Sequence, residues 1–374
     1  MRDLFVTWCT EAGCTISVDR VGNIFARRPG RDDHLPPVLM GSHLDTQVAG
    51  GKYDGIVGVL AGLEVLRTLD DAARGARKRP LELVCWTNEE GARFTPPMVA
   101  SGAFAGVFDV DWVLALRDDD GNVFGGELER IGYDGKSRGG RPRHRRLLRA
   151  AHRAGARSST ARRCPSASWW AATRARGMHV DVHGETAHAG PTPMDRRRNA
   201  LVGAAMLAVA VNEVGWKYHA TEGKATVAAP GGLAQQGRHP LRVRAAHLRR
   251  APRRARGGRP DVGRGESGDA GVRAARQRRD ARRRASGSFG SERFDPGCIR
   301  LIREAAGAPG RPAPRHPEPG RPRRLLHLAI APTAMIFTPC RDGISHNEAE
   351  HAELDYTVPG VNVLLHAVLA RANR

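Results

Sequence analysis

The chain has 374 residues, enough for two domains of ordinary size that each bury a hydrophobic core. Its six cysteines form no CxxC pair and no regular framework, which indicates free thiols in a reducing compartment and argues against a disulfide scaffold. The first residues lack the pattern of a secretory signal, and no apolar stretch reaches membrane-spanning length. We therefore expect a soluble cytoplasmic protein with no membrane partner.

The formal net charge of +21 would ordinarily indicate a nucleic-acid partner, but its distribution argues against one. Residues 138–176 carry twelve arginines and no acid, and residues 238–324 carry twenty-five arginines and eight acids. These stretches contribute charges of +12 and +17, which leaves −8 for the rest of the chain. Neither stretch has the periodicity, the interleaved aromatics or the lysines of a nucleic-acid surface. We therefore expect no nucleic-acid partner.

Residues 1–135 show the alternating pattern of an α/β domain. The segment VLMGSHLDT is an apolar run that ends in polar residues, as expected of a buried strand, and LELVCWTNEEG repeats this pattern. Between these segments, Gly55 marks a turn before apolar residues at helical spacing, namely Val59, Leu60, Leu63, Leu66 and Leu69. Polar residues thus follow both predicted strands at their carboxyl ends.

Regular patterns return after residue 176. GMHVDVHGETAHAGPTP alternates like a strand, and NALVGAAMLAVAVNEVG repeats like an amphipathic helix. Further on, the sequence predicts a helix in RFDPGCIRLIREAAG, a strand and loop in APTAMIFTPCRDGISHNEAE, and a closing helix in GVNVLLHAVLARA. Residues 138–176 and 238–286 show no usable period and few large apolar residues, a composition typical of disorder.

A group of polar residues near the predicted strand ends and loops has the chemistry of divalent-metal ligands: His43, Asp54, Glu89, Glu90 and His346. Neutral imidazole and carboxylate suit a hard to borderline divalent ion. Taken singly, each residue is more often structural or solvated. A metal pair lowers the pKa of a shared water from about 15.7 towards about 7, and a neighbouring carboxylate can then accept its proton.

Five motifs give these residues a common context: GSHLDT, GGKYDGIVGVLAGLEVLRTL, NEEGARF, AHAGPTPM and DGISHNEAE. In their order and spacing they resemble the hydantoinase/carbamoylase family of the dimetal aminoacylase and carboxypeptidase superfamily. The resemblance extends over nearly all of residues 1–137, and over 177–230, 286–308 and 328–374. Together the motifs are much more specific than any one of them.

The resemblance implies a two-metal site. His43 would bind one ion, Asp54 would bridge two ions, and Glu90 and His346 would bind the other ion. Glu89 would be the general base that activates the bridging water. The family implies two divalent ions per chain, such as zinc, manganese, cobalt or nickel.

The same resemblance implies roles for two further residues. Asp45 would orient His43 without contacting the metal. His188 would polarise the scissile carbonyl and stabilise its oxyanion. Without the family, His188 would be interpreted as a turn histidine beside Gly190 and Pro191.

The implied fold class is α/β, with a dimetal-peptidase-like catalytic domain and an inserted smaller α+β domain for lid and dimerisation. We place the catalytic domain in residues 1–176 and 287–374, and the inserted domain in residues 177–286. The implied reaction is hydrolysis of an N-carbamoyl-L-amino acid to amino acid, ammonia and carbon dioxide, by a homodimer. Allantoate and 3-ureidopropionate are alternative substrates, since each presents a ureido group and a carboxylate.

The chain departs from the family where a further metal-binding histidine is expected, in a His-Ile-Glu-Gln-Gly-Pro segment after a Gly-Gly-Arg-Pro turn. The turn is present, but His152 lies late and has no glutamate or glutamine beside it. The genetic code allows codons for Leu147–Arg157 that, read one base later, give Tyr-Phe-Glu-Arg-His-Ile-Glu-Gln-Gly-Pro. We therefore interpret three stretches as translation in a wrong frame: residues 138–176, 238–286 and 309–327.

Two hypotheses of other classes stand beside the enzyme. One is that the chain is the inactive product of a pseudogene, or of an erroneous gene sequence. The other is an arginine-rich nucleic-acid-binding protein. Sequencing the gene distinguishes them: a restored frame indicates an error, a confirmed lesion indicates a pseudogene, and neither is expected if the arginines were selected for binding.

Overall fold

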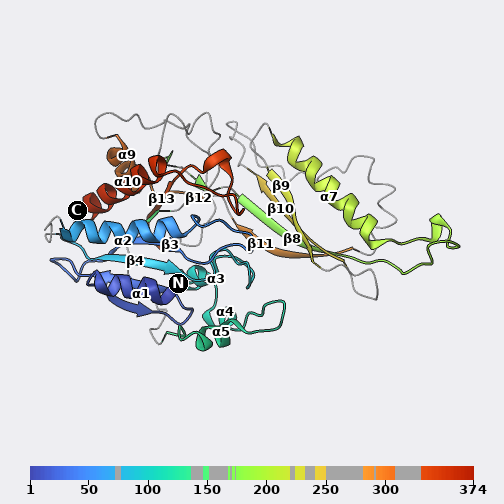
Figure 1. Cartoon of the computed structure of the whole chain (residues 1–374), viewed down its shortest axis with the longest axis horizontal. Coiled ribbons are helices and arrows are strands. Elements are labelled where there is room, and N and C mark those ends of the chain that lie inside the picture. Colours follow the sequence, from blue (N-terminus) through green and yellow to red (C-terminus); the bar gives the residue numbers. More distant parts are fainter. Residues whose placement is uncertain are drawn as a thin grey trace, which may run out of the picture. The chain divides into compact units, whose positions relative to one another are not determined.

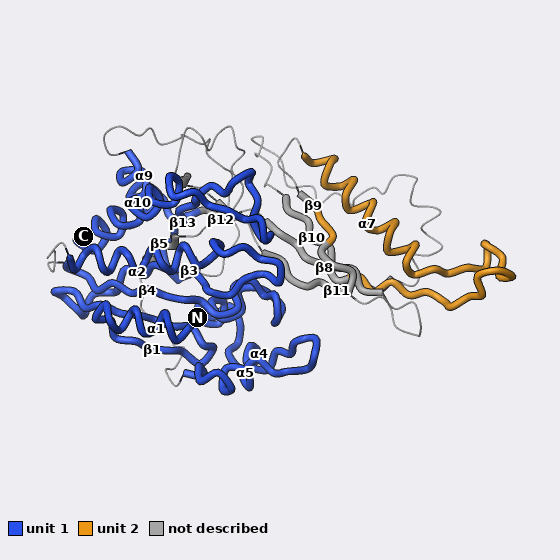
Figure 2. Tube along the Cα trace, viewed as in Figure 1, with its two compact units in different colours: residues 1–171, 293–318, 325–374 blue, residues 172–292, 319–324 orange. Residues whose placement is uncertain are grey.

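The computed structural model of the chain divides into two compact units (Figure 2). Unit 1 comprises Met1–Ala171, Arg293–Glu318 and Leu325–Arg374, and unit 2 comprises Ala172–Glu292 and Pro319–Arg324. The structure describes residues 1–71, 77–135, 146–150, 167–168, 171–172, 174–219, 224–231, 241–249, 281–289, 292–307 and 330–374.

Unit 1 is built on a seven-stranded sheet with the order β1-β2-β4-β3-β5-β13-β6. Figure 1 shows two of these strands, β3 and β4, beside helix α2. Its central strands β4, β3, β5 and β13 run parallel, so their carboxyl ends lie at one edge of the sheet. Strands β1, β2 and β6 run antiparallel to their neighbours. The strands are β1 Thr15–Val18, β2 Ile24–Arg28, β3 Val38–His43, β4 Leu81–Trp86, β5 Arg146–Ala150, β6 Ala167–Ser168 and β13 Thr333–Phe337; β7 Ala171–Ala172 and β12 Glu292–Arg293 form a separate pair.

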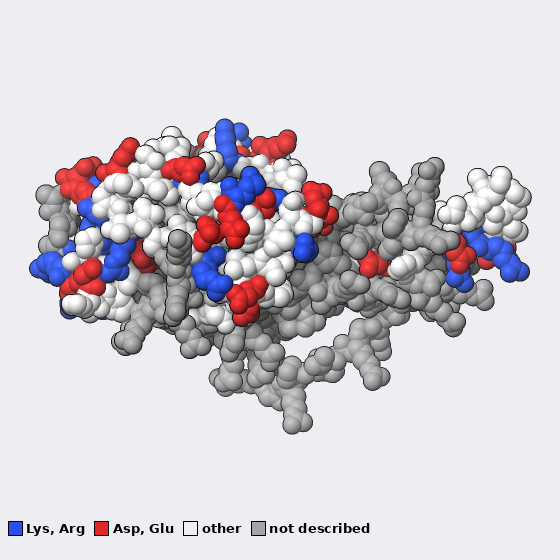
Figure 3. Space-filling view, turned by 90° about the horizontal axis from the view of Figure 1, so that it is seen from below, with Lys and Arg blue, Asp and Glu red and all other residues white. Residues whose placement is uncertain are grey.

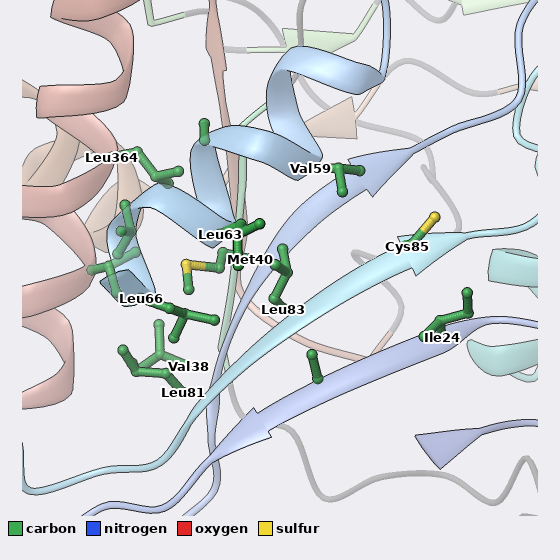
Figure 4. Packing of buried hydrophobic residues seen from close by; sticks show 14 of the residues in the cluster. Ile24, Val38, Met40, Val59, Leu63, Leu66, Leu81, Leu83, Cys85 and Leu364 are labelled. Atoms are coloured by element: carbon green, nitrogen blue, oxygen red, sulfur yellow. The ribbon is translucent and has the colours of Figure 1, made fainter. Parts of the chain in front are cut away.

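Strands β3 and β4 are buried on both faces, which matches their almost continuous apolar sequences. Successive side chains point to opposite faces. On β4, Leu83 joins one hydrophobic cluster, whereas Val84 and Trp86 join another. Figure 4 shows the first cluster, in which Leu63 of the overlying helix packs near Leu83 and Met40.

Helices cover this sheet. Helices α1, α2, α9 and α10 contribute to the larger cluster, and Phe104 of α3 packs against Phe25 and Trp86 on the other face. Helix α9 begins after Asp295, whose carboxylate accepts a hydrogen bond from the Cys298 N–H. The helices are α1 Arg2–Glu11, α2 Ile56–Asp71, α3 Val99–Phe104, α4 Val110–Leu114, α5 Phe124–Arg130, α9 Pro296–Ala306, η5 Arg341–Gly343 and α10 Leu354–Ala372.

Unit 2 contains a four-stranded antiparallel sheet with the order β11-β8-β10-β9 and a long helix, α7. Val180 and Val182 of β8 pack with Ala204 of α7, so the helix contacts the sheet through small apolar side chains. The elements are β8 Arg174–Val182, η1 Met194–Arg196, α7 Ala200–Lys217, β9 Lys224–Gly231, β10 Leu241–Arg249 and β11 Ala281–Phe289.

The expected disorder of the arginine-dense stretches is wrong where the structure describes them. Residues 241–249 and 281–289 form β10 and β11, and both pair with β8. Antiparallel ladders are made by backbone groups, which every side chain except proline leaves available. Strand β10 also begins with a short alternation of apolar and basic residues, LRVRA, which predicts a strand. Most of 138–176 and 238–286, and all of 309–327, lie outside the described residues.

Helix α7 corrects the expectation that no apolar stretch is long enough to cross a membrane. It has 18 residues and a mean hydropathy of 1.3, and 6% of it is buried. Its exposed apolar side chains include Leu201, Met206, Val209 and Trp216. Length and composition alone are weak evidence for a membrane span, because core helices of soluble proteins pass the same test.

The described surface of unit 1 mixes both signs of charge, and Figure 3 shows basic and acidic side chains interspersed over the face it presents. Arg93, for example, forms ion pairs with Asp118 and Glu127, and Arg341 forms one with Glu353. Surface pairs of this kind contribute little to stability, because solvent screens their charges. The stability of unit 1 therefore depends mainly on its buried clusters.

Candidate metal centre

The predicted site residues His43, Glu89 and Glu90 come together at the carboxyl edge of the sheet. His43 is the last residue of β3, and it lies in register with Trp86, the last residue of β4. The two glutamates come after β4, beyond a short turn. Because β3 and β4 are parallel neighbours, the residues after each strand emerge on the same side of the sheet.

The turns at this edge use backbone conformations that residues other than glycine rarely adopt. Asn88, just before Glu89, has a φ of 52°, and His346 has a φ of 54°. Such residues are uncommon and cluster at functional sites. Gly55 has a φ of 72°, and a Cβ there would lie 2.5 Å from the His43 imidazole. Glycine at this position therefore leaves room for the histidine.

Asp54, Glu90 and His346 form one cluster of possible ligands. His346 Nε2 lies 3.0 Å from Asp54 Oδ2 and 3.0 Å from Glu90 Oε1. The side chains of Asp54 and Glu90 are 12% and 8% exposed. One imidazole nitrogen and two nearly buried carboxylate oxygens make a donor set that suits a divalent cation.

His43, Glu89 and Glu90 form a second cluster. His43 Nε2 lies 3.7 Å from Glu89 Oε2 and 3.9 Å from Asp54 Oδ1. Asp54 therefore turns one oxygen towards each histidine, the arrangement that a carboxylate bridging two ions requires. Glu90 belongs to both clusters, so its carboxylate also lies between the two histidines.

Asp45 contacts both clusters, through its backbone carbonyl and through its carboxylate. His43 Nδ1 lies 2.8 Å from the backbone carbonyl oxygen of Asp45, whereas the nearest carboxylate oxygen is 3.8 Å away. The carboxylate accepts a 2.9 Å hydrogen bond from the backbone N–H of Glu90. Since a carbonyl only accepts, a neutral His43 carries its hydrogen on Nδ1 and keeps the lone pair of Nε2 for the cluster.

The electrostatics of the site favour a positive charge among the carboxylates. Hydrogen bonds with Asp54 and Glu90 raise the pKa of His346 to about 10. Burial raises the pKa of Asp54, but the hydrogen bond with His346 and the charges of His43 and His346 outweigh it and lower the pKa to about 2. Burial also raises the pKa of Asp45. The site is thus one in which a cation is stabilised.

Two residues that sequence reasoning missed contact the predicted ligands. Gln47 Nε2 donates a 2.6 Å hydrogen bond to Glu90 Oε2. Glu350 accepts hydrogen bonds from the backbone beside Asp54. Gln47 directly follows the motif GSHLDT, and Glu350 ends the motif DGISHNEAE. Their position in or beside these motifs was the only signal that the sequence offered.

His188 belongs to unit 2 and lies between β8 and η1. Its side chain is exposed, and its Nδ1 accepts a 3.1 Å hydrogen bond from the Gly190 N–H. Arg197 supports this loop by donating to the carbonyls of Ala189 and Thr192. Because His188 and the two clusters belong to different units, its part in the site stays a prediction.

Comparisons with known proteins agree on one family. The family described as Peptidase family M20/M25/M40 matches residues 39–370. The N-carbamoyl-L-amino-acid amidohydrolase of Rhizobium meliloti is 35% identical over 390 residues, covering 99% of this chain and 88% of the relative. A crystal structure of an amidase of the hydantoinase/carbamoylase family from Burkholderia vietnamiensis has a TM-score of 0.86 and 38% identity, covering 100% of this chain and 89% of that one.

A more distant relative has a different name. Allantoate deiminase of Arabidopsis thaliana is 29% identical over 228 residues, covering 55% of this chain and 40% of the relative. The comparisons confirm the resemblance that the five motifs predicted, together with the dimetal-peptidase-like α/β fold and the hydrolase class. The chain belongs to peptidase family M20/M25/M40, in its hydantoinase/carbamoylase branch.

Proposed function

We propose that the gene for this chain encodes a hydrolase of N-carbamoyl-L-amino acids that uses two divalent metal ions. The observation that carries this proposal is the position of Asp54, whose two oxygens face His43 and His346 at 3.9 Å and 3.0 Å. The full-length relative at 35% identity bears the name of this activity. The products would be the amino acid, ammonia and carbon dioxide.

The donor groups fit zinc, manganese, cobalt or nickel. They comprise imidazole nitrogens and carboxylate oxygens that lie within 4.8 Å of one another in each cluster, and no thiolate is among them. His43 and Asp54 would hold one ion, and Asp54, Glu90 and His346 the other. Such an ion pair, when bound, supplies a water with a pKa of about 7 and polarises a carbonyl oxygen.

Side chains and a backbone carbonyl of the chain would supply proton transfer, ligand orientation and stabilisation of the oxyanion. Glu89 Oε2 lies 3.7 Å from His43 Nε2, so its carboxylate is close enough to take a proton from a water between the clusters and pass it to the leaving nitrogen. The Asp45 carbonyl fixes the orientation of the His43 ring. His188 would donate a hydrogen bond to the carbonyl oxygen as negative charge develops on it.

Several finer points belong to the same proposal. The inserted domain, which includes α7, would act as lid and dimerisation domain in a cytoplasmic homodimer. Its bounds, residues 177–286, are predicted from the sequence.

Allantoate is a second candidate substrate, because a relative named allantoate deiminase aligns with 55% of the chain. 3-Ureidopropionate is a third, on chemical grounds alone. All three substrates share a ureido group and a carboxylate, so the metal clusters would treat them alike. Side-by-side turnover assays on the three substrates decide between them.

An inactive product of a pseudogene, or of an erroneous gene sequence, is the alternative of another class. It is motivated by the missing metal-binding histidine of the family, which is expected between residues 147 and 157. Sequencing the gene tests it first. A frame-restored chain, in which residues 138–176, 238–286 and 309–327 are read in the other frames, should then hydrolyse N-carbamoyl-L-amino acids. A frame-restored chain that folds and binds metal but hydrolyses none of the three substrates would refute the proposed function.

A further inference from the structure

The turn after His346 reaches back to the loop that carries Asp54. Glu350 in this turn is only 3% exposed. Its Oε1 accepts hydrogen bonds from the Tyr53 N–H at 3.2 Å and the Asp54 N–H at 3.0 Å. These N–H groups lie just before helix α2, where backbone donors lack partners within the helix and a negative charge is favourable.

The contact between the turn and the loop is too close for any residue but glycine at position 51. A Cβ on Gly51 would lie 2.3 Å from Glu350 Cβ and 2.5 Å from Glu350 Oε1. Such distances require one of the two segments to shift. Gly51 therefore allows the Glu350 carboxylate to lie directly under the backbone of the Asp54 loop.

A second contact joins the Asp54 loop to the turn after His346, and it is made by His351, the residue after Glu350. The Tyr53 hydroxyl lies 3.2 Å from His351 Nδ1, and the two rings meet edge to face at 5.4 Å. His351 Nε2 in turn lies 3.2 Å from Glu353, which is held by Arg341. The turn after His346 is therefore fastened to the loop at two successive residues.

We propose that Glu350 is a positioning residue that fixes Asp54 against His346 for metal binding. The proposal rests on the proposed function for the role of Asp54. His346 holds the Asp54 carboxylate from one side at Oδ2, and Glu350 holds the Asp54 backbone from the other. Glu350 lies four positions after His346 in the chain, so one short segment sets both contacts.

Loss of Glu350 should weaken metal binding because the geometry of Asp54 would change. A carboxylate that serves two ions must be held within a few tenths of an ångström, and residues that support ligands from outside the site typically contribute 10- to 100-fold in metal affinity. Losing the Glu350 carboxylate would free two N–H groups and the loop that they belong to. Asp54 would then sample positions in which only one of its oxygens meets an ion.

The test compares three substitutions in the full chain by cobalt(II) titration, followed through visible absorption. Glu350→Ala should weaken cobalt(II) binding about 10- to 100-fold. Glu350→Gln should stay within about threefold of the wild type, because the amide oxygen can still accept both hydrogen bonds. Its NH₂ group would replace Oε2, which has no hydrogen-bond partner among the described residues. Glu348→Ala, in the same turn but exposed, is the matched control and should bind as the wild type does.

Hydrogen exchange of the metal-free chain gives a readout that does not depend on the metal. Glu350→Ala should speed exchange of the amides of Tyr53 and Asp54, and Glu350→Gln should not. Gly51→Ala, whose Cβ would clash with Glu350, should also weaken cobalt(II) binding and speed exchange of these amides. It replaces Glu350→Ala as the test of the positioning role if Glu350→Ala does not fold. Unchanged exchange in Glu350→Ala, or equal losses of cobalt(II) affinity in Glu350→Ala and Glu350→Gln, would overturn the positioning role. A frame-restored chain that binds no metal but shows the expected exchange differences would count against the proposed function and leave the support of the Asp54 backbone established.

Discussion

The adjacent residues Glu89 and Glu90 should have different effects on metal content and turnover when each is changed to glutamine in the frame-restored chain. Glu90 accepts a 2.6 Å hydrogen bond from Gln47 at Oε2 and faces His346 at Oε1. In Glu90→Gln an amide oxygen that stays towards Gln47 keeps this hydrogen bond. The new NH₂ group then faces Asp54 and His346 in place of a lone pair, so the metal content should fall from about two ions per chain to about one.

Glu89→Gln should instead keep both ions and lose turnover. Glu89 is expected to act on a proton, and removal of a general base typically costs about 10²- to 10⁴-fold in kcat. This loss corresponds to about 3–5 kcal/mol of activation free energy. Metal content by elemental analysis and kcat on N-carbamoyl-L-amino acids check both statements. Metal loss in Glu89→Gln together with metal retention in Glu90→Gln would show that the two roles are reversed.

Three more outcomes are expected. Exhaustive removal of metal by a chelator should abolish hydrolysis by the frame-restored chain, and full activity without metal would contradict the two-metal site. Burial raises the pKa of Asp19 to about 6 from 3.8, so the folded state binds this proton more tightly than the unfolded state. Asp19 by itself should therefore lower the stability by about 3 kcal/mol as pH rises from about 4 to about 6. Asp19→Asn should flatten this dependence in urea unfolding at several pH values, and an unchanged slope would show that Asp19 does not cause it. Limited proteolysis should cut the chain as it stands within 138–176 and 238–286, and a protease-resistant, fully active product would refute the wrong-frame interpretation.

The site residues of unit 1 could be predicted because they end or follow strands with strong apolar patterns. Strand β3 ends at His43 and β4 is followed by Glu89 and Glu90, and parallel pairing brings such positions to one edge. His346 is different, since it lies nearly three hundred residues from Asp54, which it contacts. Only the family motifs connected these two residues before the structure was known.

The sequence could not supply which atom of each residue makes a contact. Asp45 was expected to orient His43, and the sequence does not show that its carbonyl makes this contact while its carboxylate accepts a hydrogen bond from Glu90. Glu350 was visible in its motif, yet its role depends on the distance between two loops that no periodicity encodes. The strands β10 and β11 were missed for another reason: composition describes side chains, and pairing with β8 is made by the backbone.

The position of β5 connects the wrong-frame interpretation with the missing metal ligand. β5 (Arg146–Ala150) lies between β3 and β13 and runs parallel to both, so its carboxyl end points to the same edge of the sheet as His43. Reading Leu147–Arg157 one base later places the histidine of His-Ile-Glu-Gln-Gly-Pro at position 151, directly after β5. His43 stands in the corresponding place on β3. A histidine there would complete the ligands on a third parallel strand, whereas the alanine that the chain carries offers no ligand atom.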